Sequence, residues 1–231
     1  MNITMEYSGT ELDAMELARN YHRWILSFFR PYIRGTVIEI GAGIGTVSEM
    51  LAECAPSQLR CYEPAANLFP HLARRMDGRA NVHVENCFYG GAGRADAVVL
   101  INVLEHIEDD RIMLERIRAS LNEGGHLLLL VPAVPAIFGT LDEQFGHFRR
   151  YGRRQLAQLV ACCGYEIELL RYLNFPGIFA WFLESRILRK RTVTSRDVKL
   201  YDKTVVPLVR AIESRIPPPI GQSLVLVARK C

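Results

Sequence analysis

The chain has 231 residues, a length that suits one α/β domain with at most a small appendage. Hydrophobic residues make up 49% of it and charged residues 23%, which excludes global disorder. The net charge of +3 is too small to indicate nucleic-acid binding by itself. The longest apolar stretch, residues 175–188, is interrupted by Glu184 and Arg186, so no stable membrane insertion is expected.

The N-terminal residues and the cysteines both indicate a cytoplasmic protein. Residues 1–17 carry acidic side chains and lack the apolar core of a signal peptide. The six cysteines include no CxxC pair, and no set of Cys and His residues has the spacing of a zinc site. We therefore expect reduced thiols and no bound metal.

Along the chain, a helical segment comes first, and from residue 36 apolar runs of strand length alternate with further helical segments. Helices are predicted at residues 11–29, 49–54, 67–76, 111–121 and 153–164. Strands are predicted at residues 36–40, 58–62, 81–84, 96–101, 124–131, 165–173 and 223–230. Strands that are apolar throughout and alternate with helices indicate a parallel sheet with helices on both faces.

Two regions interrupt this alternation, at residues 132–152 and 174–202. Both follow the carboxyl ends of predicted strands, where open α/β sheets bind ligands. We therefore expect a single domain, residues 1–231, in four parts. These parts are an N-terminal helical lid (1–35), a cofactor-binding core (36–131), substrate-side loops with an insert (132–202), and a closing helix and strand (203–231).

Three glycines stand at the turn after the first strand, in the sequence VIEIGAGIGTV. Gly41, Gly43 and Gly45 make a GxGxG pattern, and Thr46 stands where a dinucleotide fingerprint has its third glycine. The Lys-Ser/Thr pair of a phosphate-binding P-loop is absent from the sequence. Bare backbone at this turn therefore indicates close approach to a ligand other than a pyrophosphate.

Two acidic residues narrow the choice of ligand. Glu63 stands at the end of the second strand, where a carboxylate can accept both hydroxyls of a ribose. Glu39, before the first glycine, can brace the loop or bind an ammonium group directly. These residues indicate a ligand with a ribose, an amino group and no essential phosphate. S-adenosylmethionine fits this description, and we predict it as the cofactor.

These motifs resemble the class I S-adenosylmethionine-dependent methyltransferases. The resemblance rests on VIEIGAGIG, on CYEP after the second strand, on INVLEHIEDD after the fourth and on GGHLLLLVPA at the fifth. A narrower likeness, carried by NYHRWI, GHFRRY, YLNFPG and SLVLVARK, is to a bacterial small-molecule subgroup. The resemblance implies a Rossmann-like, mostly parallel sheet of seven strands, with helices on both faces and the last strand antiparallel.

The resemblance also assigns cofactor contacts. It places Glu39 and the three glycines around the methionine end, Glu63 on the ribose and Pro64 beside the adenine. Asn86 stands near the position of the family's adenine-binding aspartate. Asn102 and Leu104 would follow strand four beside the methionine portion, with His106 near the pocket. The full predicted cofactor set is Glu39, Gly41, Gly43, Gly45, Glu63, Pro64, Asn86, Asn102, Leu104 and Tyr21.

The candidate catalytic residues are His147, beyond strand five, Tyr172, near the end of strand six, and Asn174, just after strand six. Histidine has an ordinary pKa near neutrality, so His147 is either a base for a hydroxyl acceptor or a loop-fixing residue. Arg149 and Arg150 either clamp an anionic substrate or hold acids of their own loop. Aromatic residues outside the strands, Tyr21 among them, can cover the sulfonium because its charge favours aromatic faces.

Methyl transfer to oxygen or nitrogen of a small metabolite is the leading functional hypothesis. One alternative is displacement of methylthioadenosine by the cofactor's own amine, which closes a four-membered ring; another is cofactor binding without catalysis. INVLEH stands where nucleic-acid methyltransferases carry an Asn/Asp-Pro-Pro-aromatic tetrad, so no nucleic-acid partner is expected. A homodimer and the role of the basic segment 186–196 stay open.

Overall fold

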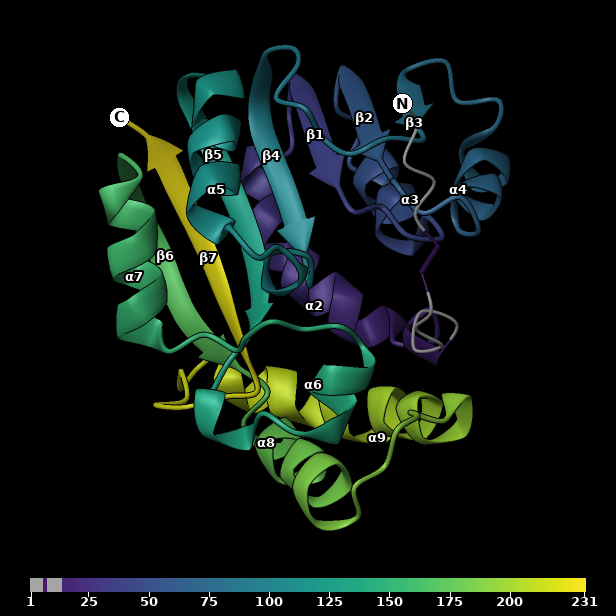
Figure 1. Ribbon diagram of the computed structural model, residues 1–231, viewed down its shortest axis with the longest axis vertical. Helices are drawn as coiled ribbons and strands as arrows, with labels where there is room; N and C mark the ends of the chain where they lie inside the picture. Colours follow the sequence, from purple (N-terminus) through teal and green to yellow (C-terminus); the bar gives the residue numbers. More distant parts are fainter. Residues whose placement is uncertain (1–5, 8–13) are drawn as a thin grey trace.

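The computed structural model describes residues 6–7 and 14–231, and its centre is a seven-stranded sheet (Figure 1). The strand order is β3-β2-β1-β4-β5-β7-β6. The strands are β1 (Thr36–Ile40), β2 (Gln58–Tyr62), β3 (Val82–Glu85), β4 (Ala95–Ile101), β5 (Leu121–Pro132), β6 (Tyr165–Leu173) and β7 (Ser223–Lys230). β7 pairs antiparallel with β5 and β6, and the other neighbours are parallel, so the predicted fold class is confirmed.

Helices cover both faces of this sheet because alternate strand residues point to opposite sides. On one face Val37 and Val99 join a core with α2 (Arg19–Phe29), α3 (Thr46–Glu53), α4 (Phe69–Met76) and α9 (Ser195–Glu213). On the other face Ile38 and Val98 pack with α5 (Asp110–Ser120) and α7 (Arg153–Cys162). The central strands are apolar on both faces for this reason.

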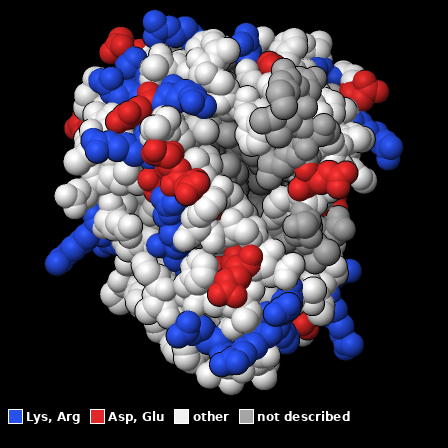
Figure 2. Space-filling view, in the orientation of Figure 1, with Lys and Arg blue, Asp and Glu red and all other residues white. Residues whose placement is uncertain are grey.

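The remaining elements gather at the carboxyl ends of β1 and β4, below the sheet in Figure 1. They are the short helices η2 (Leu104–His106), η3 (Pro135–Ile137) and α6 (Thr140–Gln144), then α8 (Phe175–Phe182) and the π-helix η4 (Leu183–Ile187). The short helix η1 (Arg30–Tyr32) instead directly precedes β1, at the amino end of that strand. Lys and Arg side chains gather over the lower end of the molecule, where α8 and η4 lie (Figure 2). In the described part of the chain, no helix combines the length and apolar character needed to cross a membrane.

Most element boundaries lie within three residues of the predicted ones, and two of the differences concern β5 and the first helix. β5 begins at Leu121 and not at Gly124, so α5 ends one residue earlier than expected. The predicted first helix starts at residues outside the described ones, and α2 begins at Arg19.

α9 is the largest difference. It runs without a break across the expected division between residues 202 and 203, with Pro207 inside it. Its start is capped by Thr194, whose side chain accepts a hydrogen bond from Asp197 N. Val198, Tyr201 and Val205 recur at helical spacing and pack on the core, which stabilises the helix despite the proline.

Candidate functional site

The glycine loop joins β1 to α3 in a conformation that requires glycine. Gly41, Gly43 and Gly45 have φ angles of 73°, 57° and 87°. A Cβ atom at Gly41 would lie 2.5 Å from Cγ2 of Val103, which follows β4. The backbone can therefore approach the end of β4 only because a side chain is absent there.

Glu63, at the end of β2, holds this loop in place. Its carboxylate accepts a hydrogen bond of 2.7 Å from Gly43 N and one of 2.8 Å from Ala65 N. Asn86 Nδ2 donates to the backbone oxygen of Glu63 at 2.9 Å. Burial raises the pKa of Glu63, and the two backbone donors oppose that rise. The predicted ribose acid is thus fixed by the glycine loop that follows the neighbouring strand.

Glu39, near the end of β1, has a different environment. It is buried, it lines a cavity, and its Oε2 has no hydrogen-bond partner among the described residues. Burial raises its pKa to about 7; interactions with the side chains of Ser48 and Cys61 oppose the rise, and the negative charge of Glu63 adds to it. A buried carboxylate in the wall of a cavity is suited to bind a cationic group.

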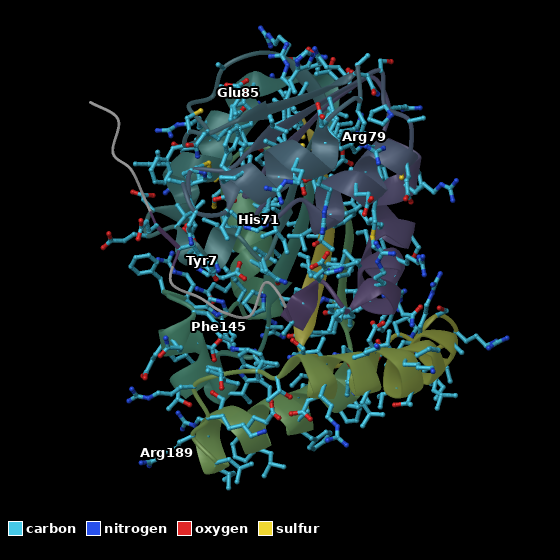
Figure 3. All side chains as sticks on the ribbon, turned by 90° about the vertical axis from the view of Figure 1, so that its right-hand side faces the viewer. Tyr7, His71, Arg79, Glu85, Phe145 and Arg189 are labelled. Atoms are coloured by element: carbon cyan, nitrogen blue, oxygen red, sulfur yellow. The ribbon has the colours of Figure 1, made fainter. Side chains whose placement is uncertain are left out.

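The cavity lies between the glycine loop and the elements below the sheet, and its volume is about 350 Å³. Figure 3 shows Tyr7 and Phe145, two of its lining residues, on the same side of the molecule. The predicted site residues that line it are Tyr21, Glu39, Gly41, Gly43, Asn102, His147 and Asn174. Those outside its lining are Gly45, Glu63, Pro64, Asn86, Leu104 and Tyr172.

Leu104 and Tyr172 lie away from the cavity for packing reasons. Leu104 is fully buried in the core on the α5 and α7 face of the sheet. Tyr172 pairs with Leu224 within the sheet and packs against that same core. Tyr21, the aromatic residue expected beside the cofactor, lines the cavity, and Trp24 of α2 packs in the core.

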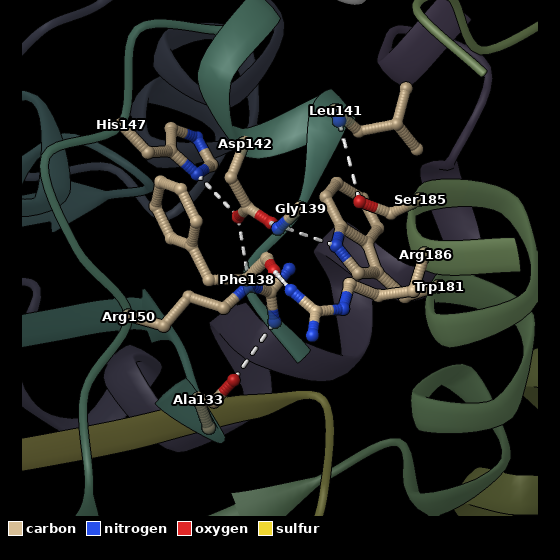
Figure 4. Close-up of polar contacts among 10 residues, drawn as sticks. All are labelled: Ala133, Phe138, Gly139, Leu141, Asp142, His147, Arg150, Trp181, Ser185 and Arg186. Carbon is tan, nitrogen blue, oxygen red and sulfur yellow. Dashed lines mark hydrogen bonds and ion pairs between the residues drawn. The ribbon is translucent and has the colours of Figure 1, made fainter. Parts of the chain in front are cut away.

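Asp142 is the centre of a buried polar network on the substrate side of the cavity (Figure 4). Its Oδ1 accepts hydrogen bonds from His147 Nδ1 at 2.9 Å and Arg150 Nε at 2.7 Å. Its Oδ2 accepts from Gly139 N and Trp181 Nε1, both at 3.1 Å. Burial alone would raise the pKa of Asp142, but the His147 hydrogen bond and the Arg150 charge hold it below its ordinary value.

The ionised state of Asp142 fixes the tautomer of His147. A carboxylate can only accept hydrogen bonds, so Nδ1 of His147 carries the proton. Nε2 is then the unprotonated nitrogen of the neutral ring, on a side chain that lines the cavity. This arrangement gives the predicted base an oriented imidazole with a free lone pair.

Two neighbours of His147 complete this part of the cavity. The ring of His106 lies with its centroid 4.7 Å from that of His147. Burial lowers the His106 pKa to about 4, and repulsion from His147 would add to this whenever His147 is protonated. Glu105 is fully buried, and neither of its carboxylate oxygens has a partner among the described residues. Burial raises its pKa to about 8. Glu105 was not predicted as a site residue from the sequence. The feature that could have indicated it is its position directly before His106 in INVLEHIEDD.

The other substrate-side residues have structural partners. Arg149 pairs with Asp110 at 2.8 Å, and Arg150 pairs with Asp142 and donates to the Ala133 carbonyl. Asn174 is buried with a φ of 62°. Its side chain accepts from Tyr201 and donates to Gln222, so it shapes the cavity wall with both polar groups occupied.

The sheet order, the glycine loop after β1 and the acid after β2 define a class I S-adenosylmethionine-dependent methyltransferase. A family profile described as "Methyltransferase domain" matches residues 14–170, and the chain belongs to this family. Its cofactor is S-adenosylmethionine.

The chain is similar to a curated protein, the ribosomal RNA small subunit methyltransferase C of Erwinia tasmaniensis. The two are 25% identical over 133 residues, which cover 53% of this chain and 38% of that relative. The chain therefore matches well under half of the length of this relative.

Solved structures share the fold. Phosphoethanolamine N-methyltransferase 2 of Haemonchus contortus, in complex with S-adenosylmethionine, has a TM-score of 0.63 at 20% identity, over 91% of this chain and 52% of that chain. The present chain thus spans about half of that enzyme. A putative methyltransferase from Bacillus halodurans has a TM-score of 0.59 at 15% identity, over 89% of this chain and 98% of its own.

Proposed function

We propose that the protein moves the methyl group of S-adenosylmethionine to an oxygen or nitrogen atom of a small metabolite, in the cytoplasm. The observation that carries the proposal is that His147, held by Asp142, lines the same cavity as the glycine loop. A cofactor on the loop and an acceptor beside His147 would therefore share one cavity.

The residues of the loop fit the cofactor. Glu39, a buried acid that lines the cavity, would bind the α-ammonium group. Gly41 and Gly43 offer backbone without side chains, and Asn102 lines the cavity opposite them. Glu63, directly after β2, and Asn86, directly after β3, would hold the nucleoside end. When bound, the cofactor supplies a methyl group activated by its sulfonium charge.

A small acceptor suits the size and walls of the cavity. Its volume of about 350 Å³ is in the range of small-molecule sites. Tyr21, Phe145 and Trp181 supply apolar surface, while His147 supplies an oriented polar group. An acceptor hydroxyl beside Nε2 of His147 can give its proton to that nitrogen, and Asp142 stabilises the resulting imidazolium. The remaining rate enhancement would come from holding the acceptor in line with the methyl group and from excluding water.

The test is transfer of a labelled methyl group from S-adenosylmethionine into two fractions of a cell extract, small metabolites and RNA. We expect label in the small-metabolite fraction only. Label in the RNA fraction would overturn the assignment of the acceptor class. Formation of methylthioadenosine would support the chain-displacement reaction, and binding without any turnover would support a non-catalytic role.

A further inference from the structure

Three potential metal ligands from two distant loops meet in the cavity wall. Glu105 and His106 follow β4, and His147 follows α6. One oxygen or nitrogen atom from each side chain lies within 4.8 Å of those of the other two. All three residues line the cavity that also contains Gly41 and Gly43, so the cluster is next to the predicted cofactor pocket.

Glu105 has no protein partner that accounts for its burial. The residue has no exposed surface, and both carboxylate oxygens lack a hydrogen-bond partner in the part of the chain that the structure describes. A buried polar group without a partner costs about 1–3 kcal/mol, and more if it is charged. A cation held between Glu105 and the two histidines would supply the missing partner.

The orientation of His147 fits a metal ligand as well as a base. Its Nδ1 donates to Asp142, which leaves the lone pair of Nε2 free. A carboxylate bound to the second nitrogen is the usual outer partner of a metal-binding histidine, because it fixes the ring and raises the basicity of the ligand. Asp142 is itself held by Gly139 and Trp181, so the ring has a rigid support.

The charges around the cluster allow a divalent cation. Arg150 is the nearby positive charge, and it is already paired with Asp142 at 2.7 Å. With Glu105 ionised and both histidines neutral, Glu105, Asp142 and Arg150 together carry one negative charge. A divalent cation would change this local sum to one positive charge, which an anionic acceptor, or an acceptor hydroxyl that has lost its proton, can offset.

We propose that Glu105, His106 and His147 bind one divalent transition-metal cation. Two imidazole nitrogens and one carboxylate suit Zn²⁺, Co²⁺ or Fe²⁺ better than Mg²⁺ or Ca²⁺, which prefer oxygen ligands alone. Three protein ligands leave coordination positions for oxygen atoms of an acceptor in the cavity. The inference rests on the proposed function and deepens it: with the cation bound, His147 would act on the acceptor through the metal, and an acceptor hydroxyl would give its proton to solvent water instead of to His147.

The test is titration of the chelator-treated, full-length protein with Co²⁺, followed by visible absorption. The spectrum separates nitrogen and oxygen ligands from thiolates, which matters because all six cysteines are free. We expect one equivalent to bind without thiolate charge-transfer bands. Glu105→Gln and His106→Gln should each weaken binding at least about 100-fold, while His71→Gln, at an exposed position, should leave it unchanged.

Thermal unfolding of each variant shows whether it is folded. S-adenosylmethionine binding, measured on the same samples, separates the two proposals. Absence of Co²⁺ binding by wild-type protein, or equal affinity in both ligand variants, would overturn the metal site even where the cofactor binds. Failure of the cofactor to bind would instead overturn the proposed function, whatever the result with Co²⁺.

Discussion

Asp142 and His147 are joined by a hydrogen bond of 2.9 Å, and Asp142 has no exposed surface. The same oxygen of Asp142 also accepts from Arg150, so one buried carboxylate orients an imidazole and neutralises a guanidinium. The geometry of the substrate side of the cavity therefore depends on this single acid.

We expect Asp142→Ala to lower the free energy of unfolding by about 3–5 kcal/mol, because it leaves the buried Arg150 charge without its partner. Chemical denaturation measures this loss. The matched control is Glu143→Ala, at the exposed neighbouring position, which should stay within about 0.5 kcal/mol of wild type. Equal stability of the two variants would contradict the role of Asp142.

His147→Ala should separate catalysis from cofactor binding. We expect kcat to fall by about 10²–10⁴-fold, because the group that acts on the acceptor is removed. The affinity for S-adenosylmethionine should change little, since the glycine loop and Glu39 are intact. Steady-state kinetics and calorimetry measure the two quantities. A parallel loss of both would make His147 a structural residue.

Cofactor affinity should depend on pH through Glu39. The pKa of Glu39 in the free protein is raised to about 7, so below pH 7 the side chain is mostly protonated. It must then lose that proton before it can pair with an ammonium group. Affinity should therefore fall as the pH drops below 7, by up to about tenfold per pH unit. Calorimetry between pH 8 and pH 5 tests this. Glu39→Gln should bind more weakly and without the slope; an unchanged slope in the variant would assign it to another group.

Glu63→Ala should weaken cofactor binding by at least about tenfold. The variant loses the acceptor of Gly43 N and Ala65 N, so the loop that approaches the cofactor is no longer held. Glu85→Ala is the control, because Glu85 ends the neighbouring strand β3 at an exposed position (Figure 3). Unchanged affinity in Glu63→Ala would remove this residue from the site.

Gly41→Ala and Gly78→Ala form a matched pair. Both glycines have positive φ angles, 73° and 75°, so both variants carry backbone strain of about 1–2 kcal/mol. Only at Gly41 would the new Cβ meet another side chain, at 2.5 Å from Val103; at Gly78 no heavy atom lies within 4 Å. Denaturation should therefore show the larger loss of stability in Gly41→Ala, and equal losses would contradict the close approach.

The sheet and the loop after β1 were predictable from sequence because their signals are local. A short, mostly apolar run bounded by turns, such as residues 96–101, is typical of a buried strand. Closely spaced glycines at a turn indicate a backbone conformation that other residues rarely adopt. α9 was not predicted as one helix, because Pro207 and many polar residues mask the apolar positions that pack on the core.

The substrate side of the cavity was less predictable because it depends on contacts between distant segments. His147 was predicted as a candidate from the sequence. Glu105 was not, because its closeness to His147 depends on how the segment after β4 packs against the segment after α6. Tyr172 was predicted as a catalytic candidate from its position in the chain. In the structure, the pairing of β6 with β7 places the Tyr172 side chain against the core. The sequence of β6 has no regular apolar alternation that would predict this pairing.

The central claim is that the cavity supports methyl transfer, and the adenosine product tests it most directly. The purified protein is incubated with S-adenosylmethionine and a small-metabolite extract, and the products are identified by mass spectrometry. The account predicts S-adenosylhomocysteine together with a metabolite that has gained one methyl group. Methylthioadenosine accompanied by a cyclic amino acid would contradict it, because the cofactor's own chain would then have reacted.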